Sequence, residues 1–259
     1  MILDEIISHK RREVEESKQR FPEKRLIRAL EEHAGAKDAR SFSNAISGSR
    51  GTHIIAEIKK ASPSLGVIRE DFNPLKIAEL YETGGAKALS ILTETRYFEG
   101  RPSYLKTVRK VSSLPILRKD FILGSYQVYE SAVPSADALL LIAMILSSEE
   151  LMQLIQLAGK YQMDALVEVH SEEDLVKAID AGAKIIGINN RNLSTLEVNV
   201  KAAERLLPKI PKGKIIVIES GIEKKEEIDY YKSLGVHAFL IGTSLMKSKD
   251  ILSKLQGLI

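Results

Sequence analysis

The chain has 259 residues, 44% hydrophobic and 28% charged, a composition typical of globular proteins that excludes wholesale disorder. It has no cysteine, which excludes a disulfide framework, a thiolate nucleophile and a cysteine-ligated metal. The net charge is only +3, without a basic stripe interleaved with aromatic residues. The longest apolar run, Ala138–Leu146, is far shorter than the ~20 residues that span a bilayer. We therefore expect a cytoplasmic protein that binds neither nucleic acid nor a membrane.

Residues 1–50 precede the first strand-like segment. Their opening stretch, MILDEIISHKRREVEESKQR, has the pattern of an amphipathic, highly charged helix, and acidic residues stand where a signal peptide has a basic start. We expect residues 1–50 to form a helical extension that lies across the rest of the domain. A solvated helix that takes no part in a functional site is an equal alternative.

Eight short runs rich in β-branched residues follow, separated by longer amphipathic stretches. Runs of five or six apolar residues are typical of strands buried on both faces of a parallel sheet. The predicted strands are Ile54–Lys60, Ala88–Thr93, Pro115–Asp120, Ala138–Ala143, Ala165–Val169, Ile185–Asn189, Lys214–Glu219 and Ala238–Gly242.

Helix signals fill the intervals between these runs. Asn73 and Pro74 pair a capping residue with proline at the first helical position, and acidic residues follow Ser147 and Ser171, as in a first helical turn. The alternation of strands and helices predicts an α/β fold with a parallel sheet.

The spacing of the units favours a closed sheet over an open one. A small residue precedes every second strand, at Gly85, Ser135, Gly182 and Gly235, which fits four quarters of a barrel. No GxGxxG fingerprint follows the first strand, as it would in an open dinucleotide-binding sheet. We predict one domain over residues 1–259, a single (β/α)8 TIM barrel with its core at 53–247 and an N-terminal helical extension.

Charged side chains stand at the strand ends, where such barrels carry their reactive groups. Glu57 and Lys59 are two residues apart at the end of the first strand, so they share a face and form a candidate reactive pair. A rim salt bridge would explain any single charged end, but several at the same end of the barrel indicate a site. The other polar strand ends are Lys119, Glu168, Asn189 with Arg191, and Glu219.

The surroundings of Lys119 follow from strand alternation. Arg118 and Asp120 are expected to face the helix layer, whereas Leu117 and Phe121 share the face of Lys119 and make its surroundings apolar. Desolvation there would lower the pKa of the lysine, and the charge of nearby Glu57 or Glu168 would offset that effect.

Glycines and hydroxyls follow the last two strands. Ser220-Gly221 comes after the seventh strand, and Gly242-Thr243 comes after the eighth, where the final helix begins. Backbone N–H groups at such positions bind phosphate oxygens. Either glycine alone could be a turn residue, but the two in adjacent positions predict a phosphate site.

The histidines do not indicate a metal site. His53 and His237 precede strands one and eight, at the opposite end of the barrel, and are expected to be structural. His170 follows Glu168, and we expect its side chain to point away from that carboxylate. No second histidine or carboxylate stands at a metal-ligand spacing from it.

Seven motifs resemble a known family: IIAEIKKASPS, ILTETRYFEG, ILRKDFI, LVEVHSEEDL, IIGINNRNL, ESGI and LIGTSLM. Their order and spacing over about residues 53 to 247 are similar to the indole-3-glycerol phosphate synthase family of tryptophan biosynthesis. The resemblance implies a carboxy-lyase that converts 1-(2-carboxyphenylamino)-1-deoxyribulose 5-phosphate to indole-3-glycerol phosphate, carbon dioxide and water. It implies no nucleotide, flavin or metal cofactor, and we expect a monomer or a weak homo-oligomer.

The resemblance also implies roles for individual residues. Lys119 would be the general acid that protonates the substrate carbonyl, Glu168 would transfer protons during dehydration, and the Glu57–Lys59 pair would orient the substrate. The other implied contacts are hydrogen bonds from Asn189 and Glu219, Arg191 near the substrate carboxylate, phosphate loops at Ser220, Gly221, Gly242 and Thr243, an apolar wall of Phe98, Phe121 and Leu140, and a mobile loop with Ser62 and Pro63.

Two alternatives remain on the residues alone. Phosphoribosylanthranilate isomerase has a similar phosphate site, but that family uses a cysteine at the end of strand one, where this chain has Glu57. A non-catalytic barrel that binds a sugar phosphate would keep the loops at Gly221 and Gly242 and would not need Lys119 and Glu168.

Overall fold

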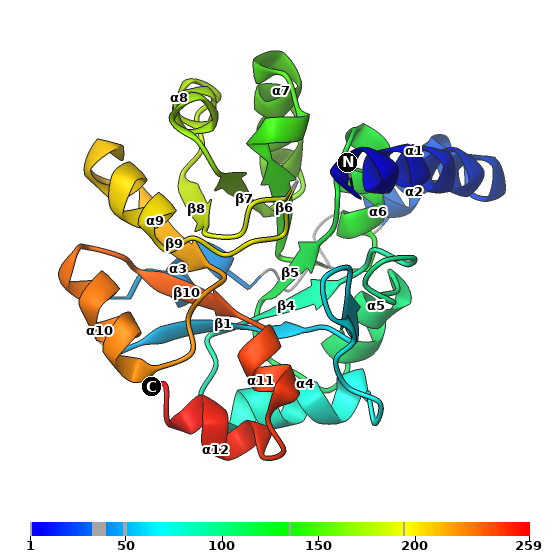
Figure 1. Cartoon of the computed structure of the whole chain (residues 1–259). Helices are drawn as coiled ribbons and strands as arrows, with labels where there is room; N and C mark the ends of the chain where they lie inside the picture. The colour runs from blue at the N-terminus through cyan, green and yellow to red at the C-terminus, as the bar shows by residue number, and fades with distance from the viewer. Residues whose placement is uncertain (1, 33–39, 49–50, 135, 194) are drawn as a thin grey trace.

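The computed structural model describes residues 2–32, 40–48, 51–134, 136–193 and 195–259, and its centre is a closed barrel of parallel strands surrounded by helices (Figure 1). The strand order is β1-β10-β9-β8-β7-β6-β5-β4. The barrel strands are β1 (His53–Ile58), β4 (Ala88–Leu92), β5 (Ile116–Lys119), β6 (Ala138–Ile142), β7 (Asp164–Val169), β8 (Ile185–Asn189), β9 (Ile215–Glu219) and β10 (Ala238–Ile241). The predicted TIM barrel is confirmed, and each predicted strand overlaps an observed one. Ser135, one of the small residues used to predict closure, lies outside the described residues.

Helices cover the outside of the barrel (Figure 1). Asn73 caps α4 by accepting hydrogen bonds from the backbone N–H groups of the first turn, and Ser147 and Ser171 form capping boxes at α7 and α8, as predicted. The outer helices are α4 (Pro74–Thr83), α5 (Ser103–Arg109), α6 (Ser125–Ala132), α7 (Ser148–Lys160), α8 (Glu172–Asp180), α9 (Lys201–Leu206), α10 (Lys225–Ser233), α11 (Thr243–Lys247) and α12 (Ile251–Gln256), with 3-10 turns at Ala143–Ile145 and Leu207–Lys209. A short hairpin of β2 (Ala61–Ser62) and β3 (Gly66–Val67) follows β1. Across the described ranges, no helix is long and apolar enough to cross a membrane.

Strand alternation divides the apolar core into two layers. Ile54 and Leu89 pack between the strands and the helices, whereas Ile55, Leu117 and Val217 fill the interior of the barrel. Each strand therefore presents alternate side chains to the barrel axis. At the carboxyl ends of the strands, those inward positions carry charges instead of apolar groups.

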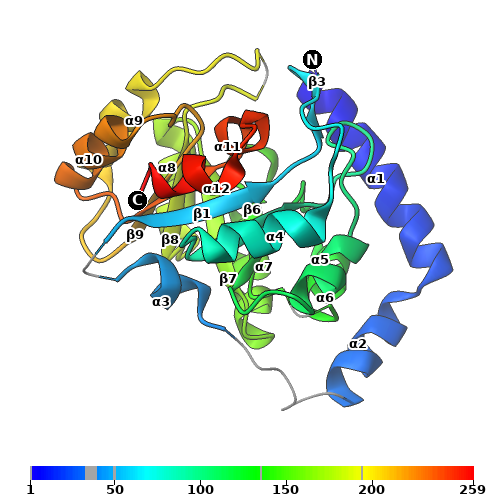
Figure 2. The ribbon, with the colours of Figure 1, turned by 90° about the horizontal axis from the view of Figure 1, so that it is seen from below.

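The N-terminal extension consists of α1 (Ile2–Arg20), α2 (Glu23–Glu32) and α3 (Phe42–Ile46), and it contacts the barrel at both ends (Figure 2). Phe42 and Ile46 of α3 are fully buried in the interior core near the amino end of β1. Leu3 and Ile6 of α1 belong to the same core near the mouth. Helix α1 is therefore packed on the barrel, and the alternative of a solvated helix is wrong for it.

Candidate active site

A cavity of about 260 Å³ opens at the carboxyl ends of the barrel strands. All the predicted site residues except Ser62 and Pro63 line it: Glu57, Lys59, Phe98, Lys119, Phe121, Leu140, Glu168, Asn189, Arg191, Glu219, Ser220, Gly221, Gly242 and Thr243. Ser62 and Pro63 line a smaller adjoining cavity, together with Leu3 and Ile6 of α1. The structure thus brings residues from all eight barrel strands, or from the loops that follow them, to one place.

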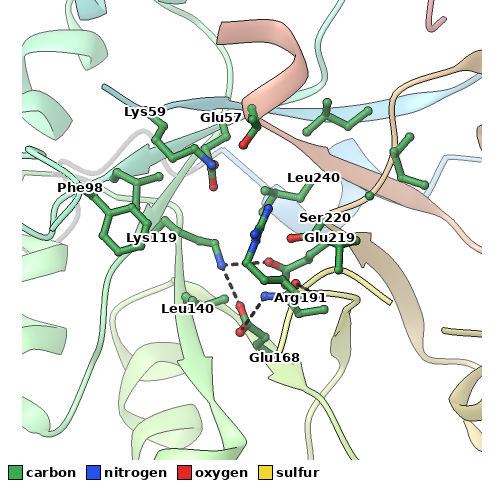
Figure 3. Close-up of a pocket in the computed structure, with 18 of the residues that line it drawn as sticks. Glu57, Lys59, Phe98, Lys119, Leu140, Glu168, Arg191, Glu219, Ser220 and Leu240 are labelled. Atoms are coloured by element: carbon green, nitrogen blue, oxygen red, sulfur yellow. Dashed lines mark hydrogen bonds and ion pairs between the residues drawn. The ribbon is translucent and has the colours of Figure 1, made fainter. Parts of the chain in front are cut away.

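The cavity cluster, formed by Lys119, Glu168 and Glu219, joins three strands across the barrel mouth (Figure 3). Nζ of Lys119 on β5 lies 2.8 Å from Oε2 of Glu168 on β7 and 2.9 Å from Oε2 of Glu219 on β9. The lysine side chain is 14% exposed, and the two carboxylates are almost fully buried. One ammonium and two carboxylates therefore meet at the edge of the cavity.

The cluster sets the protonation of its members. Burial opposes the charged form of Lys119, but the negative charges of Glu168 and Glu219 outweigh burial and raise the pKa of the lysine. Burial likewise opposes the ionised form of Glu168, and Lys119 outweighs it, so the pKa of Glu168 is lowered. Lys119 is therefore an ammonium and Glu168 a carboxylate at neutral pH.

Glu219 differs from its neighbour. Burial, helped by the charge of Glu168 and opposed by Lys119, raises the pKa of Glu219 to about 7. Among the described residues, its Oε1 is buried without a hydrogen-bond partner. A Cβ at position 187 would lie 2.3 Å from that oxygen, so Gly187 on β8 makes room for the carboxyl group.

Glu57 and Lys59 form the predicted pair at the end of β1, with Nζ of Lys59 2.7 Å from Oε1 of Glu57. Gly242 lies against this pair, since a Cβ there would come within 2.3 Å of Oε1 of Glu57. The φ of Gly242 is −125°, which any residue can adopt, so the glycine is needed for space and not for its backbone conformation.

Two aromatic rings and a leucine form the apolar wall. The ring centroids of Phe98 and Phe121 are 6.3 Å apart, and Leu140 is buried in the barrel interior beside Phe121. Phe98 lies in the loop after β4 and is half-buried. The fully buried Glu94 holds this loop by accepting backbone N–H groups, including that of Phe98 at 3.0 Å.

His170 contacts the site, and the expectation that it points away from Glu168 is wrong. Its Nε2 lies 2.9 Å from Oε1 of Glu168, and Nδ2 of Asn189 donates to the same oxygen at 3.1 Å. Residues two apart on a strand share a face, so the spacing itself contained this signal.

A buried asparagine braces the loop after β9. Nδ2 of Asn190 donates to the carbonyl oxygen of Ser220 at 3.1 Å, and its Oδ1 accepts the backbone N–H of Ala203 in α9. Ser220 and Gly221 have φ values of 64° and 80°, so two successive residues are in the left-handed region. Asn190 was missed in the sequence because it faces away from the barrel axis.

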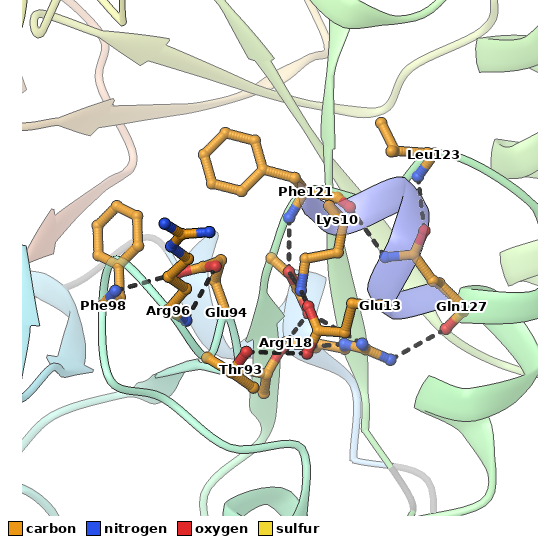
Figure 4. Close-up of polar contacts among 12 residues, drawn as sticks. Lys10, Glu13, Thr93, Glu94, Arg96, Phe98, Arg118, Phe121, Leu123 and Gln127 are labelled. Carbon is orange, nitrogen blue, oxygen red and sulfur yellow. Dashed lines mark hydrogen bonds and ion pairs between the residues drawn. The ribbon is translucent and has the colours of Figure 1, made fainter. Parts of the chain in front are cut away.

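The anchoring cluster is formed by Lys10, Arg118 and Asp120, and Figure 4 shows Lys10 and Arg118 among its polar contacts. It lies on the helix side of β5, since Arg118 also donates to residues of α6. Asp120 accepts Nζ of Lys10 at 2.8 Å and the guanidinium of Arg118 at 2.9 Å. The backbone N–H of Phe121 and the hydroxyl of Thr93 also donate to Asp120. Alternation along β5 is confirmed, and the cluster fastens α1 to the strand that carries Lys119.

Among the described residues, one group of two carboxylates and a histidine has the spacing of metal ligands. Ligand atoms of His9, Glu13 and Glu94 lie within 4.8 Å of one another. However, Glu94 already accepts backbone N–H groups of its loop, and Glu13 pairs with Lys10 at 2.6 Å. These contacts show that the carboxylates of the group stabilise α1 and the loop after β4.

Comparisons with known proteins show the family to which the chain belongs. A family model described as indole-3-glycerol phosphate synthase matches residues 3–258. Proteins of that name from Sulfurimonas denitrificans and from Campylobacter jejuni subsp. doylei are 49% and 46% identical to this chain. The first alignment covers 96% of this chain and 95% of the relative, and the second covers 100% of both. The chain belongs to the indole-3-glycerol phosphate synthase family.

Membership assigns the chain to the decarboxylating lyases of tryptophan biosynthesis, and the isomerase alternative is set aside. Solved structures at much lower identity support the fold alone. The tryptophan synthase A-subunit of Pyrococcus furiosus is 13% identical, with a TM-score of 0.59 and coverage of 80% of this chain and 97% of that chain. KGPDC from Streptococcus mutans is 11% identical, with a TM-score of 0.61 and coverage of 81% of this chain and 96% of that chain.

Proposed function

We propose that the cavity at the barrel mouth converts 1-(2-carboxyphenylamino)-1-deoxyribulose 5-phosphate to indole-3-glycerol phosphate, carbon dioxide and water. The observation that carries the proposal is the position of the Lys119 ammonium between the carboxyl groups of Glu168 and Glu219 at the edge of the cavity. Family membership supplies the reaction, and this arrangement supplies an acid and a base at hydrogen-bond distance.

Lys119 is the proposed general acid. The ring carbon that bears the carboxylate attacks the ketose carbonyl carbon, and the carbonyl oxygen takes a proton from Nζ of Lys119 as the carbon–carbon bond forms. The raised pKa keeps the lysine protonated until this moment. The developing alkoxide is a much stronger base than the carboxylates of Glu168 and Glu219. It can therefore take the Nζ proton of Lys119, although both carboxylates accept hydrogen bonds from that ammonium.

Glu168 is the proposed base. Loss of carbon dioxide returns an electron pair to the ring. The new hydroxyl then takes up a proton from solvent and leaves as water, while the carbon skeleton loses a proton that can pass from Glu168 back to the neutral Lys119. Glu168 is ionised, and Lys119 and Asn189 hold its carboxylate in place, which suits it to accept that proton. Glu57 and Lys59 orient the substrate from the opposite side of the mouth.

The remaining lining residues match the other parts of the substrate. Phe98, Phe121 and Leu140 form an apolar wall suited to the anthranilate ring, and Arg191 provides a cation for its carboxylate. We assign hydrogen bonds with the substrate hydroxyls to Asn189 and Glu219. We assign Ser62 and Pro63, which line the adjoining cavity, to the mobile loop after β1.

The phosphate is proposed to bind at Ser220, Gly221, Gly242 and Thr243. Among the described residues, no side chain caps the N-terminus of α11, so the backbone N–H groups of its first turn are available to an anion.

Gly242→Glu is a poor test of this phosphate site, because any side chain at position 242 would collide with Glu57. Thr243→Glu should raise KM about tenfold or more by repelling the dianion, while an acid in the first turn still suits the helix. An unchanged KM would move the phosphate elsewhere, and a sulfate-soaked crystal would show where.

The direct test is to add the carboxyphenylamino substrate to the purified protein and follow indole fluorescence. We expect multiple turnovers by the native chain and a large loss in Lys119→Met. A non-catalytic sugar-phosphate-binding barrel predicts the opposite result, namely that substrate binds and competes with phosphate while no indole product forms.

A further inference from the structure

His170 is a buried titratable residue that the proposed reaction does not use. It follows β7 directly, its side chain is only 8% exposed, and its Nε2 lies 2.9 Å from Oε1 of Glu168. A buried polar group of this kind is costly unless its hydrogen bond contributes to the structure or to the site.

The two oxygens of Glu168 have different partners. Oε1 accepts Nε2 of His170 and Nδ2 of Asn189, whereas Oε2 accepts Nζ of Lys119 at 2.8 Å. A carboxylate held through both oxygens cannot rotate about its last bond without losing these contacts. The pair of donors on Oε1 therefore keeps Oε2 directed at the ammonium group.

The position of His170 is itself set by the start of α8. Its backbone N–H donates to Oδ2 of Asp174 at 3.0 Å, and the backbone N–H of Ser171 donates to the same oxygen at 3.1 Å. Asp174 also closes the capping box of α8 with Ser171. The imidazole is thus fixed at its backbone by a helix terminus and at its ring by Glu168.

We propose that His170 is a positioning residue, which holds Oε1 of Glu168 so that Oε2 faces Lys119 and the carboxylate remains ionised. The inference rests on the proposed role of Glu168 as the base of the reaction. His170 acts through Glu168 and need not touch the substrate.

The charges around the ring are consistent with this role. Glu168 on β7, Asp174 on α8 and Glu219 on β9 face it, and the ammonium of Lys119 lies beyond Glu168. Burial opposes the protonated form of the imidazole, but the hydrogen bond to Glu168 and these negative charges outweigh burial and raise the pKa of His170. Its Nε2–H is therefore a donor to Glu168, with added positive charge as the pH falls.

The test compares His170→Leu, which removes the donor, with His170→Gln, whose amide can still donate without a charge. His53→Gln is the matched control, since His53 is similarly buried and lies at the other end of the barrel, 3.0 Å from the carbonyl oxygen of His237. Steady-state kinetics are measured for each across the pH range in which histidines and carboxylates titrate.

We expect His170→Leu to lower kcat about tenfold with little change in KM, because a hydrogen bond to an ionised group is lost. The acidic limb of its kcat/KM profile should move to higher pH, since Glu168 loses a donor that favours its ionised form. His170→Gln should retain most of kcat with a smaller shift of the limb. His53→Gln should leave both quantities unchanged.

The inference is overturned if His170→Leu keeps the native kcat and pH profile and changes only the unfolding temperature, as a structural histidine would. Should the leucine variant not fold, His170→Ser, which is too short to reach Glu168, replaces it in the same comparison. Glu168→Gln is assayed in parallel. If Glu168→Gln retains native kcat, the proposed base is wrong and so is the inference about His170. If Glu168→Gln loses kcat while His170→Leu keeps it, only the role of His170 is refuted.

Discussion

Strand β5 separates the cavity cluster from the anchoring cluster, and both are buried groups of opposite charges. In the anchoring cluster, each carboxylate oxygen of Asp120 accepts two donors, and the Arg118 side chain is 2% exposed. In the cavity cluster, Lys119 reaches the cavity, and Oε1 of Glu219 has no hydrogen-bond partner among the described residues. The clusters thus differ in spare hydrogen-bonding capacity, and the side chain of Lys119 is more exposed than any side chain of the anchoring cluster.

This difference distinguishes a structural cluster from a catalytic one more clearly than burial or charge does. An ionic cluster whose hydrogen-bonding groups are all paired has no free group to bind a substrate, and its loss lowers the free energy of unfolding. A cluster with an open face holds its charges ready for groups that develop in the reaction. The following predictions test that distinction.

The largest effect should come from Lys119→Met, which keeps the length of the side chain and removes its proton. We expect kcat to fall by roughly 10²–10⁴, the usual contribution of an acid or base, while KM changes much less. Folding should survive, because Glu219, whose pKa is about 7, can take up a proton once the ammonium is gone. If the variant retains more than about a tenth of native kcat when chemistry limits the rate, Lys59 becomes the first alternative acid.

Asp120→Asn should show the opposite profile. It leaves the cations of Lys10 and Arg118 without their shared carboxylate, and we expect the free energy of unfolding to fall by about 3–5 kcal/mol. The kcat of the folded fraction should change far less than in Lys119→Met. Denaturant unfolding and kinetics on the same sample measure both quantities.

The matched control is Glu16→Gln, which breaks an exposed ion pair with Arg20 in the same helix α1. Surface pairs of this kind contribute at most about 1 kcal/mol, so its unfolding should be nearly native. A fall of kcat in Asp120→Asn as deep as that in Lys119→Met, with native stability, would break the distinction between the two clusters.

Acid should weaken the anchoring cluster by protonating Asp120. Burial opposes the ionised form of Asp120, but Lys10 and Arg118 outweigh it and lower the pKa of Asp120 from 3.8 to about 2. The folded state thus binds this proton less readily than the unfolded chain, so the contribution is complete above about pH 4 and is lost as the pH falls towards 2. We expect about 2 kcal/mol of pH-dependent stability from this group. Unfolding measured across that window should be less pH-dependent in Asp120→Asn, and equal slopes in both proteins would contradict the assignment.

Among the variants of the cavity and the anchoring cluster, the smallest effect should come from Phe98→Ala. Its ring is half-buried in a loop, so removing it should weaken substrate binding by ~1–3 kcal/mol and change stability little. Titration with substrate or an anthranilate-like inhibitor measures the first quantity, and thermal unfolding the second. A large loss of unfolding temperature with an unchanged KM would place Phe98 in the core instead.

Much of the architecture was predictable because it follows from local periods. Apolar runs of five or six residues located all eight barrel strands, and the caps at Asn73 and Ser171 located helix starts. Period two along β5 correctly separated Lys119 from Arg118 and Asp120. The same rule places His170 on the face of Glu168, two residues before it, so the expectation that its side chain points away was wrong.

The partners of these side chains were not predictable in the same way. Lys10 meets Asp120, and Glu219 meets Lys119, over long separations along the chain. Nothing in either local segment encodes the other, so Lys10 was missed, and Glu219 was expected only to bind substrate. Asn190 was missed because its function is to brace Ser220 in a neighbouring loop.

The sequence by itself determined which residues form strands, which face each side chain takes, and which strand ends carry charge, because these depend on local period and steric preference. The tertiary structure alone decided that one ammonium stands between Glu168 and Glu219, and that the carboxyl group of Glu219 keeps one oxygen without a partner among the described residues. Those facts follow from closure of the barrel, which fixes the register of distant strands and brings their ends to one rim. Burial at that rim then sets the pKa of each group, and burial is a property of the assembled fold and not of any segment.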